Sequence, residues 1–491
     1  MCGSCNAIIQ YKLTFGPNSK AKLKKNAELD NKTNIIFTFK SMSKIAVIGG
    51  GLVGSLLSVF LAKKGFEVSV FEKRTDIRKA KIVAGRSINL VVADRGWKAL
   101  EKAGIHDAIR QITVPVYGRM AHGTDGNQDF QQYSIDRKAI YSVSRAELNK
   151  RLIEIADDFD NVSFHFEHKC TGITEDGARA SFTNNLGADV QVEADVIFGA
   201  DGANSEVRNS MRDHLEKNDP DGDYEFLEEY IEHGYKELII PPDENGKWVL
   251  DESALHIWPR KQYMLMALAN LDGGFTCTLF LPFKGTFSFE TLQTQDDLMA
   301  FFNEVFVDAV PLMPTLKNDF FENPTSRLVI VKCTPWMYMN RVALIGDAAH
   351  AIVPFYGEGM NCGFEDCNVL NSLIDKSGTD WNTVLPQYYK ARKPNADAIA
   401  NLSLRNFVEM RDLISDPDFI FRKKIEAKLQ TTFPDEWIPL YSQVKFTDIP
   451  YSEAWTEGLR QDEVMKKIIA IKGIEDKWED DSFAESVTHL I

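Results

Sequence analysis

A glycine-rich turn at residues 44–54 is the first part of this chain that could do chemistry. The stretch reads KIAVIGGGLVG, so a β-branched run leads into Gly49, Gly51 and Gly54 with the spacing G-x-G-x-x-G. In such a turn the first glycine permits the bend, the second lets the backbone approach a phosphate, and the third lets helix pack on strand. An apolar helix is expected at 52–64, with its N-terminal amides facing the negative charge. The pattern predicts a nucleotide pyrophosphate site.

A carboxylate at the end of the next expected strand fits the same site. Residues 67–72 read EVSVFE, and Glu72 follows Gly49 by 23 positions. This spacing is typical of an acid that accepts hydrogen bonds from an adenosine ribose. Such an acid favours an unphosphorylated 2′ position, so FAD or NAD is expected at this site rather than NADP. The alternative is a solvated carboxylate at a strand end.

Two later segments also break a strand at glycine and aspartate. Residues 199–202 read GADG, and residues 346–350 read GDAAH after an apolar run. A strand-end aspartate can accept a hydrogen bond from a sugar alcohol, and a glycine lets a cofactor come close. The segment 354–361, PFYGEGMN, then opens another helix whose amides would face that place. Either segment alone could be an ordinary turn between strand and helix.

Composition limits the classes of function. The 491 residues include 56 basic and 71 acidic ones, a formal net charge of −15, which argues against nucleic acid and anionic membranes as partners. Seven cysteines, an odd number, do not suggest a disulfide framework, so a reducing compartment is expected. The sequence holds no run of 18 apolar residues, so no stable membrane insertion is expected. It also lacks a second G-x-G-x-x-G and a C-x-x-C beside a strand, which argues against a disulfide reductase.

Residues 1–43 are polar and rich in lysine and asparagine, and we expect them to form a flexible N-terminal extension. They lack the long apolar core of a signal peptide and the arginine-rich helix of a mitochondrial presequence. Cys2 and Cys5 form a C-x-x-C, but no second cysteine or histidine pair lies nearby in the sequence. Neither a metal site nor a redox function is therefore expected there.

Periodicity indicates the elements that must position these residues. Between residues 254 and 282 apolar side chains recur with a period of two, which predicts strands of an antiparallel sheet. Residues 218–223, NDPDGD, are the most loop-like interior stretch and mark an excursion out of the nucleotide-binding part. Residues 360–430 are mostly polar and helical in pattern.

Together these motifs resemble the FAD-dependent aromatic hydroxylases, the single-component flavoprotein monooxygenases. The first and third glycine motifs are shared across that class. The stretches GRSINL at 85–90, HIWP at 256–259 and IPLY at 438–441 are narrower, and they resemble the branch of the family that hydroxylates kynurenine. The resemblance runs roughly from residue 44 to residue 455.

The resemblance implies an α/β fold with a doubly wound, Rossmann-like FAD-binding domain, an antiparallel-sheet substrate domain and a helical C-terminal part. It also implies hydroxylation of L-kynurenine at ring position 3, with non-covalent FAD, with NADPH as a transient co-substrate, and with O2. The reactive oxygen would be carried on the flavin C4a as a hydroperoxide, so no side-chain catalyst is expected. The expected boundaries are 44–115, 140–215 and 330–378 for the FAD-binding domain, 116–139 and 216–329 for the sheet domain, and 379–491 for the helical region.

For FAD, the resemblance implies that Glu72 binds the adenosine ribose, that Arg145 approaches the ribityl–pyrophosphate region, and that Asp347 accepts from ribityl or phosphate-side groups. Met360 and Asn361 lie at the helix start expected to support the N1–O2 edge, where negative charge grows on reduction. The remaining expected cofactor contacts are Val53, Arg74, Val91 and Asp201. The alternative for Arg145 is a surface ion pair with Glu147 or Glu154.

For the substrate, Arg119 matches the family's carboxylate-binding arginine, and its planar fork suits bidentate pairing. Tyr133, Asn406 and Tyr441 match the other polar contacts to the amino-acid head, although Asn406 could instead cap or bridge helices. The aryl ring would lie among apolar side chains for which plain core packing is the alternative. These expected wall residues are Met266, Leu268, Phe280, Pro354 and Phe355.

The chain also departs from this family. Eukaryotic members carry a C-terminal membrane anchor, whereas residues 456–491 are charged, so a cytoplasmic location is expected rather than attachment to the mitochondrial outer membrane. Glu358 stands between two glycines where the family more often has glutamine, and a buried, ionised carboxylate there would oppose a flavin anion. Two alternatives stay open: a related hydroxylase of another aromatic acid, and a non-catalytic flavin-binding module.

Overall fold

The structure, a computed structural model, describes residues 43–79, 88–134, 136–413 and 416–491. The expected extension up to residue 42, with Cys2 and Cys5, lies outside the described residues. So do Gly85, Arg86 and Ser87 of the GRSINL stretch. The domain boundaries expected from the sequence stay a prediction.

A six-stranded sheet carries the first glycine turn. Its strand order is β18-β19-β12-β1-β2-β8, and every neighbouring pair is parallel except β18 with β19. Carboxyl ends of parallel strands meet at one edge, so the turns after β1, β12 and β19 converge there. The strands are β1 (Lys44–Ile48), β2 (Glu67–Glu72), β8 (Val162–Phe166), β12 (Val196–Gly199), β18 (Met337–Tyr338) and β19 (Val342–Leu344).

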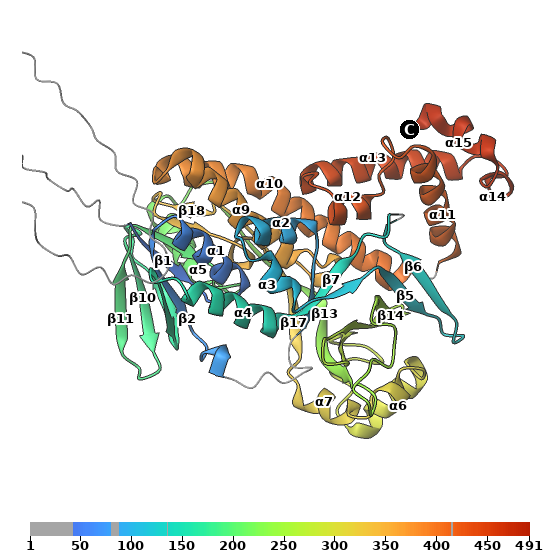
Figure 1. Ribbon diagram of the computed structural model, residues 1–491, viewed down its shortest axis with the longest axis horizontal. Coiled ribbons are helices and arrows are strands. Elements are labelled where there is room, and N and C mark those ends of the chain that lie inside the picture. Colours follow the sequence, from blue (N-terminus) through green and yellow to red (C-terminus); the bar gives the residue numbers. More distant parts are fainter. Residues whose placement is uncertain (1–42, 80–87, 135, 414–415) are drawn as a thin grey trace, which may run out of the picture. The chain divides into compact units, whose positions relative to one another are not determined.

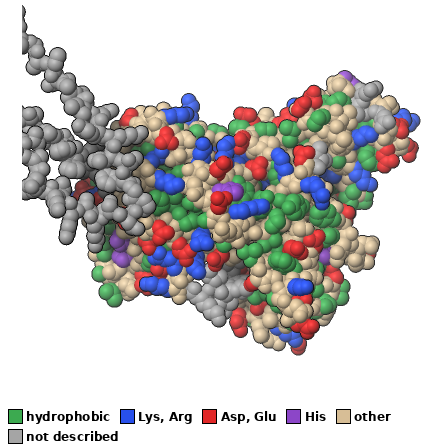
Figure 2. Space-filling view, in the orientation of Figure 1, with side chains coloured by type: hydrophobic (Ala, Val, Ile, Leu, Met, Phe, Trp, Pro, Cys, Tyr) green, Lys and Arg blue, Asp and Glu red, His purple; other side chains and the backbone are tan. Residues whose placement is uncertain are grey.

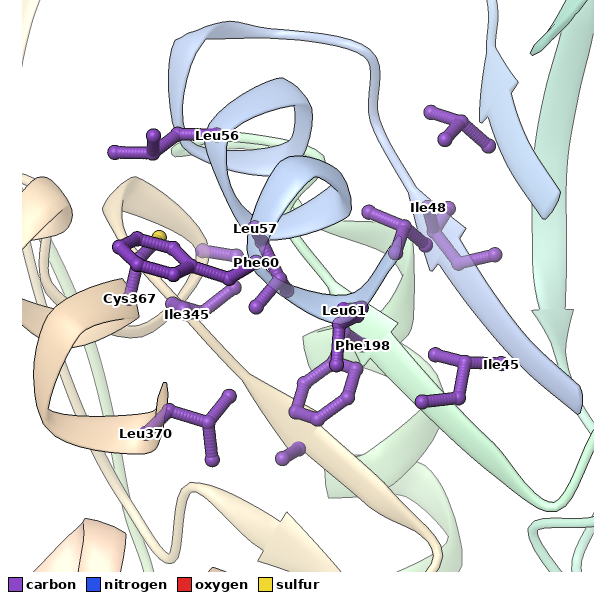
Figure 3. Close-up of a cluster of buried hydrophobic side chains, with 14 of the residues drawn as sticks. Ile45, Ile48, Leu56, Leu57, Phe60, Leu61, Phe198, Ile345, Cys367 and Leu370 are labelled. Carbon is purple, nitrogen blue, oxygen red and sulfur yellow. The ribbon is translucent and has the colours of Figure 1, made fainter. Parts of the chain in front are cut away.

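Helix α1 (Leu52–Lys63) is buried at every position from residue 54 to residue 62, which explains why its sequence is almost entirely apolar. Figure 3 shows Leu57 and Phe60 of this helix among side chains of the sheet and of α9 (Gly359–Ser377), including Phe198 and Leu370. Burying each side chain of this size stabilises the fold by about 2 kcal/mol. This packing holds the start of α1 rigidly at the end of β1. Helices α2 (Asp94–Lys102), α3 (His106–Arg110), α4 (Arg145–Asp157), α5 (Glu206–Asn218) and α8 (Asp347–His350) complete this part.

A seven-stranded sheet follows the order β17-β13-β16-β15-β14-β5-β6, and all its neighbouring pairs are antiparallel except β14 with β5. The antiparallel strands expected at 254–282 are confirmed as β14, β15 and β16. The strands are β5 (Gly118–His122), β6 (Gln128–Gln132), β13 (Glu225–Ile240), β14 (Ala254–Arg260), β15 (Tyr263–Ala269), β16 (Phe275–Pro282) and β17 (Ser326–Thr334).

Successive side chains of β15 and β16 point to opposite faces of this sheet. Leu265 and Leu279 belong to the core that α6 (Gln295–Val305) and α7 (Leu316–Glu322) cover, as Figure 1 shows below the sheet. Met264 and Phe280 belong to a second cluster on the other face, with Phe355 and Phe407. The second face is therefore the one turned toward the C-terminal helices.

Two small sheets complete the strands. One has the order β3-β7-β4, formed by Asn89–Val92, Ile140–Ser144 and Val114–Val116, and it joins the two large sheets. The other, β11-β10-β9, is formed by Asp189–Glu193, Arg179–Asn184 and His168–Ile173. It was not anticipated from the sequence, because its short alternating strands are partly exposed and polar.

The C-terminal part is helical, as expected. Helix α10 (Trp381–Val408) packs against α9 and α13, and it crosses the upper part of Figure 1 in orange. Of the helices among the described residues, none combines the length and apolar content needed to cross a bilayer. On the face drawn in Figure 2, basic and acidic side chains are interspersed. The remaining helices are α11 (Pro417–Thr432), α12 (Leu440–Phe446), α13 (Tyr451–Ile469), α14 (Ile474–Lys477) and α15 (Asp481–Val487).

Candidate functional site

A cavity of about 840 Å³ lies where the six-stranded sheet, the seven-stranded sheet and the C-terminal helices meet. It collects most of the residues that the sequence singled out. Of the expected substrate and cofactor contacts, three do not line it: Gly54, Asn361 and Asn406. The expected residues that do line it are Gly49, Gly51, Val53, Glu72, Arg74, Val91, Arg119, Tyr133, Arg145, Asp201, Met266, Leu268, Phe280, Asp347, Pro354, Phe355, Met360 and Tyr441.

The three glycines of the first turn have three different surroundings. Gly49 has φ +109°, and a Cβ there would lie 2.3 Å from the carbonyl oxygen of Ala200. A Cβ at Gly54 would lie 2.0 Å from the carbonyl oxygen of Gly49, so this glycine permits helix and strand to touch. A Cβ at Gly51 would meet nothing within 4 Å. Gly51 therefore faces open cavity at the start of α1, where no side chain caps the helix.

Glu72 is held as an acceptor beside this turn. Its carboxylate accepts from the Gly50 amide at 2.9 Å and from Nε of Arg74 at 2.8 Å. Burial alone would raise the pKa of Glu72, but the hydrogen bonds and charge of Arg74 lower it below the usual value. Glu72 is thus ionised near neutral pH, as the binding of ribose hydroxyls requires.

Arg145 and Asp201 lie on opposite walls. Arg145 is exposed in the cavity, and neither of the two acids named as alternatives pairs with it; Glu154 instead lies 3.5 Å from Arg151. The carboxylate of Asp201 accepts from the Ser205 hydroxyl at 2.5 Å and from the Glu206 amide at 2.8 Å. Arg145 forms no salt bridge among the described residues, although its charge acts on the Glu237 carboxylate, whereas Asp201 holds the start of α5.

The Gly346–Asp347 turn lies against Val53 of α1 and, with the start of α9, completes the cradle. Gly346 has φ +61°, and its amide donates to Oδ2 of Asp366 at 3.2 Å. Asp347 is exposed to the cavity with no protein partner among the described residues. Asn361 turns inward, where its side chain donates to the Val91 carbonyl at 2.9 Å and accepts from the Ala93 amide at 3.0 Å. The first turn of α9 thus offers backbone amides, and its beginning lines the cavity at Gly359 and Met360.

A buried ionic network lies behind this turn. Asp366 accepts from Nε of Arg392 at 2.6 Å and lies 2.6 Å from Nε2 of His350. Ligand atoms of His350, Cys362 and Asp366 lie within 4.8 Å of one another, a spacing that could suit a metal ion. Arg392, however, contacts both Asp366 and the Cys362 sulfur, the latter at 3.2 Å. A guanidinium already neutralises the carboxylate, so the group is an ion-pair network that fixes the turn.

Arg119, Tyr133 and Tyr441 form a polar corner at the far end of the cavity. The Arg119 guanidinium carbon lies 4.9 Å from the Tyr441 ring centroid and 5.7 Å from that of Tyr133. Nε of Arg119 and the Tyr133 hydroxyl are buried and make no hydrogen bond of good geometry among the described residues, although the guanidinium lies close enough to interact with the hydroxyls of Tyr133 and Tyr441. Burial raises the pKa of Tyr133 well above its usual value, so the hydroxyl stays a donor. Buried polar groups normally have hydrogen-bond partners, so these two groups are notable.

The walls beside this corner are apolar. The rings of Phe280 and Phe355 lie 4.8 Å apart, and Phe355 stacks on Phe407 at 4.2 Å. Asn406 donates to the Phe355 carbonyl at 2.6 Å and lies behind the wall. The backbone of Phe355 is thereby fixed, and the ring of a ligand would be held between β15, β16 and this segment.

Several lining residues were missed from the sequence. Thr276 and Thr278 lie on the same face of β16 as Phe280, so the period of two could have revealed them. Asn89 also lines the cavity, and its Oδ1 is buried without a partner among the described residues. Met410 and Lys445 come from C-terminal helical segments, and no local signal in the sequence marks them.

Comparison with known proteins agrees with this geometry. A family model described as "FAD binding domain" matches residues 42–263 and 327–403. The chain is 47% identical over 449 residues to the kynurenine 3-monooxygenase of Christiangramia forsetii, covering 91% of this chain and 98% of that one. It is 43% identical to the enzyme of that name from Dictyostelium discoideum, covering 88% and 94%. For that from Sus scrofa the identity is 41%, covering 88% and 90%.

Solved structures share the fold. A 2-methyl-3-hydroxypyridine-5-carboxylic acid oxygenase is similar with a TM-score of 0.62 at 18% identity, covering 77% of this chain and 96% of that one. A p-nitrophenol 4-monooxygenase from Pseudomonas putida is similar with a TM-score of 0.61 at 17% identity, covering 86% and 98%. With relatives of more than 40% identity along most of its length, this chain belongs to the kynurenine 3-monooxygenase family of FAD-binding proteins.

Proposed function

We propose that this chain hydroxylates L-kynurenine to 3-hydroxykynurenine, with bound FAD and with NADPH and O2 as co-substrates. The observation that carries the proposal is the corner of Arg119, Tyr133 and Tyr441, in which a buried guanidinium nitrogen and a hydroxyl make no hydrogen bond of good geometry among the described residues. It lies in the same cavity as the dinucleotide cradle. An aromatic amino acid fits both the polar corner and the apolar wall of this cavity, because its carboxylate pairs with the guanidinium while its ring packs against the apolar side chains.

The residues present fit FAD. Gly51 leaves room for a pyrophosphate at the start of α1, Glu72 is an ionised acceptor for the adenosine ribose, and Arg145 is an exposed cation without a salt bridge among the described residues. Asp347 would accept from the ribityl chain. Met360 and Asn361 would act through their backbone amides, because the Asn361 side chain already donates to the Val91 carbonyl. The walls of the FAD-binding site would include Val53, Arg74, Val91 and Asp201.

FAD, when bound, supplies the redox chemistry that activates O2. The residues of this chain bind, orient and exclude water. The guanidinium of Arg119 would grip the substrate carboxylate bidentately, and the hydroxyls of Tyr133 and Tyr441 would bind the head group. Phe280, Phe355 and the strand side chains Met266 and Leu268 would hold the aryl ring and keep water away. Asn406 would act indirectly, by fixing Phe355.

The test is aerobic turnover of the purified protein with NADPH and L-kynurenine, followed by product analysis. We expect NADPH oxidation to accelerate with kynurenine and 3-hydroxykynurenine to accumulate. Hydroxylation of another aromatic acid but not of kynurenine would instead favour the related hydroxylase. A flavin that NADPH cannot reduce with any ligand would favour the non-catalytic module. The compartment and the lack of nucleic-acid partners expected from the sequence stay predictions.

A further inference from the structure

Glu358 is a fully buried acid at the start of helix α9, next to the cavity. It lies between Gly357 and Gly359, at the residue that precedes α9, and its side chain is 0% exposed. Gly357, Gly359 and Met360 line the cavity, whereas Glu358 does not. A carboxylate in such a place is costly unless charged and hydrogen-bonding partners satisfy it.

The partners of Glu358 come from the C-terminal helices. Nζ of Lys445, in α12, lies 2.6 Å from Oε1, and the hydroxyl of Tyr451, in α13, donates to Oε2 at 2.5 Å. The Lys445 side chain is 1% exposed and also donates to the Gly357 carbonyl at 3.3 Å. Burial and the Glu358 charge raise the pKa of Tyr451 well above its usual value, so its hydroxyl remains a donor. Both carboxylate oxygens are thus satisfied.

The two members of the ion pair differ in their position relative to the cavity. Lys445 lines the cavity wall and Glu358 lies behind it, so the positive member is the one nearer to a bound ligand. The same wall holds the start of α9, whose backbone amides already favour negative charge. In a site with little water, a fixed charge acts over several ångströms with little screening.

We infer that the Glu358–Lys445 ion pair sets the reduction potential of the bound flavin. The pair balances two effects: the ammonium stabilises the negative charge that reduction places at the N1–O2 edge, and the carboxylate behind it limits that stabilisation. This inference rests on the proposed function, because it requires FAD to lie with that edge at the start of α9. Lys445 and Glu358 are positioning and electrostatic residues here.

Two single variants shift the potential in opposite directions. Glu358→Gln keeps the size of the side chain and one acceptor oxygen, but it removes the negative charge and leaves the ammonium unbalanced, so the potential should rise. Lys445→Met leaves the carboxylate unbalanced, so the potential should fall. Each shift should correspond to at least a tenfold change in the reduced-to-oxidised ratio, which is about 30 mV for a two-electron couple. The double variant should return close to the wild-type value.

The measurement is the midpoint potential of the FAD-loaded protein without substrate. A matched control is Glu426→Gln, because Glu426 is also buried and pairs with Lys423 at 2.9 Å, but it does not line the cavity. This control should leave the potential unchanged. Shifts of the same sign in both single variants, or no shift in either, would overturn the inference, because a merely structural pair predicts such results.

Failure of the inference and failure of the proposed function give different results. FAD affinity is measured first, by the quenching of flavin fluorescence on titration with protein. A wild-type chain that binds no FAD would overturn the proposed function and the inference together, before any potential is measured. Opposite potential shifts without hydroxylation of kynurenine would support the inference and overturn only the substrate assignment.

Discussion

Nε2 of His350 lies 2.6 Å from Oδ2 of Asp366, and the same carboxylate oxygen accepts from the Gly346 amide. Burial alone would lower the pKa of His350, but the facing carboxylate raises it well above its usual value. The stabilisation from the charged imidazole is therefore complete below about pH 6.5 and declines only as pH rises through the raised pKa. This pair ties the turn that carries Asp347 to helix α9.

Asp366→Asn should lower the free energy of unfolding by about 3 kcal/mol, because it leaves the buried His350 without its counter-charge, whereas Arg392 keeps its second partner Glu365. Equilibrium denaturation with urea measures the change. The control is Asp397→Asn, which removes the half-exposed partner of Lys393 and should cost about 0–1 kcal/mol. Equal losses in the two variants would contradict the assigned importance of the buried network.

Gly51→Ala and Gly54→Ala should separate cofactor binding from folding. A Cβ at Gly51 meets no protein atom within 4 Å, so this variant should fold with an almost unchanged midpoint of thermal unfolding. It should bind FAD at least tenfold more weakly, because the methyl group enters the pyrophosphate cradle. Gly54→Ala places a Cβ 2.0 Å from the Gly49 carbonyl oxygen and should destabilise the apoprotein by about 1–3 kcal/mol or more. A Gly51→Ala protein with wild-type FAD affinity would place the pyrophosphate elsewhere.

Arg119→Ala should weaken L-kynurenine binding by about 1.5–3 kcal/mol, the value of hydrogen bonds to a charged group. Arg119→Lys should recover only part of this loss, because an ammonium cannot form the bidentate pair. Quenching of flavin fluorescence or the substrate dependence of NADPH oxidation gives the dissociation constant. Arg110→Ala is a suitable control, since Arg110 lies over the Tyr141 ring at 3.6 Å and does not line the cavity. A ligand that lacks the carboxylate should bind the Arg119→Ala and wild-type proteins equally.

Acid should destabilise the seven-stranded sheet through His122. Nε2 of His122 lies 2.9 Å from Nδ1 of His256, and burial, with the nearby His256, lowers the pKa of His122 to about 4. Between pH 4 and about 6.5 the unfolded chain binds a proton that the folded ring does not, so stability falls as pH falls through this window. His122→Gln should flatten the slope of unfolding free energy against pH there. An unchanged slope would show that other groups account for acid unfolding.

Much of the FAD cradle could be predicted because its signals are local. Gly49, Gly51 and Gly54 recur at a fixed spacing within one strand–turn–helix unit, and Glu72 ends the adjacent strand. Such positions recur at fixed spacings, so the sequence alone reveals them. The small sheet β9–β11 could not be found in this way, because its half-exposed strands lack a continuous apolar pattern.

The polar substrate-binding residues were predicted from the family resemblance and not from a pattern in the sequence. Arg119, Tyr133 and Tyr441 are brought together from β5, the segment after β6, and α12. Asn406 shows the limit of such transfer: it was expected to contact the head group, and the structure places its side chain against the Phe355 backbone, outside the cavity lining. Its contact with the substrate stays a prediction.

The sequence by itself determined the nucleotide-binding turn, the antiparallel strands at 254–282 and the family, because glycine spacing and side-chain periodicity are properties of a few consecutive residues. Only the tertiary structure decided that Lys445 neutralises Glu358, that Asp366 joins His350 to Arg392, and that the Asp201 carboxylate holds the start of α5. The physical reason is that charge pairing depends on distances between side chains far apart along the chain, and those distances are set by how the helices pack on the sheets.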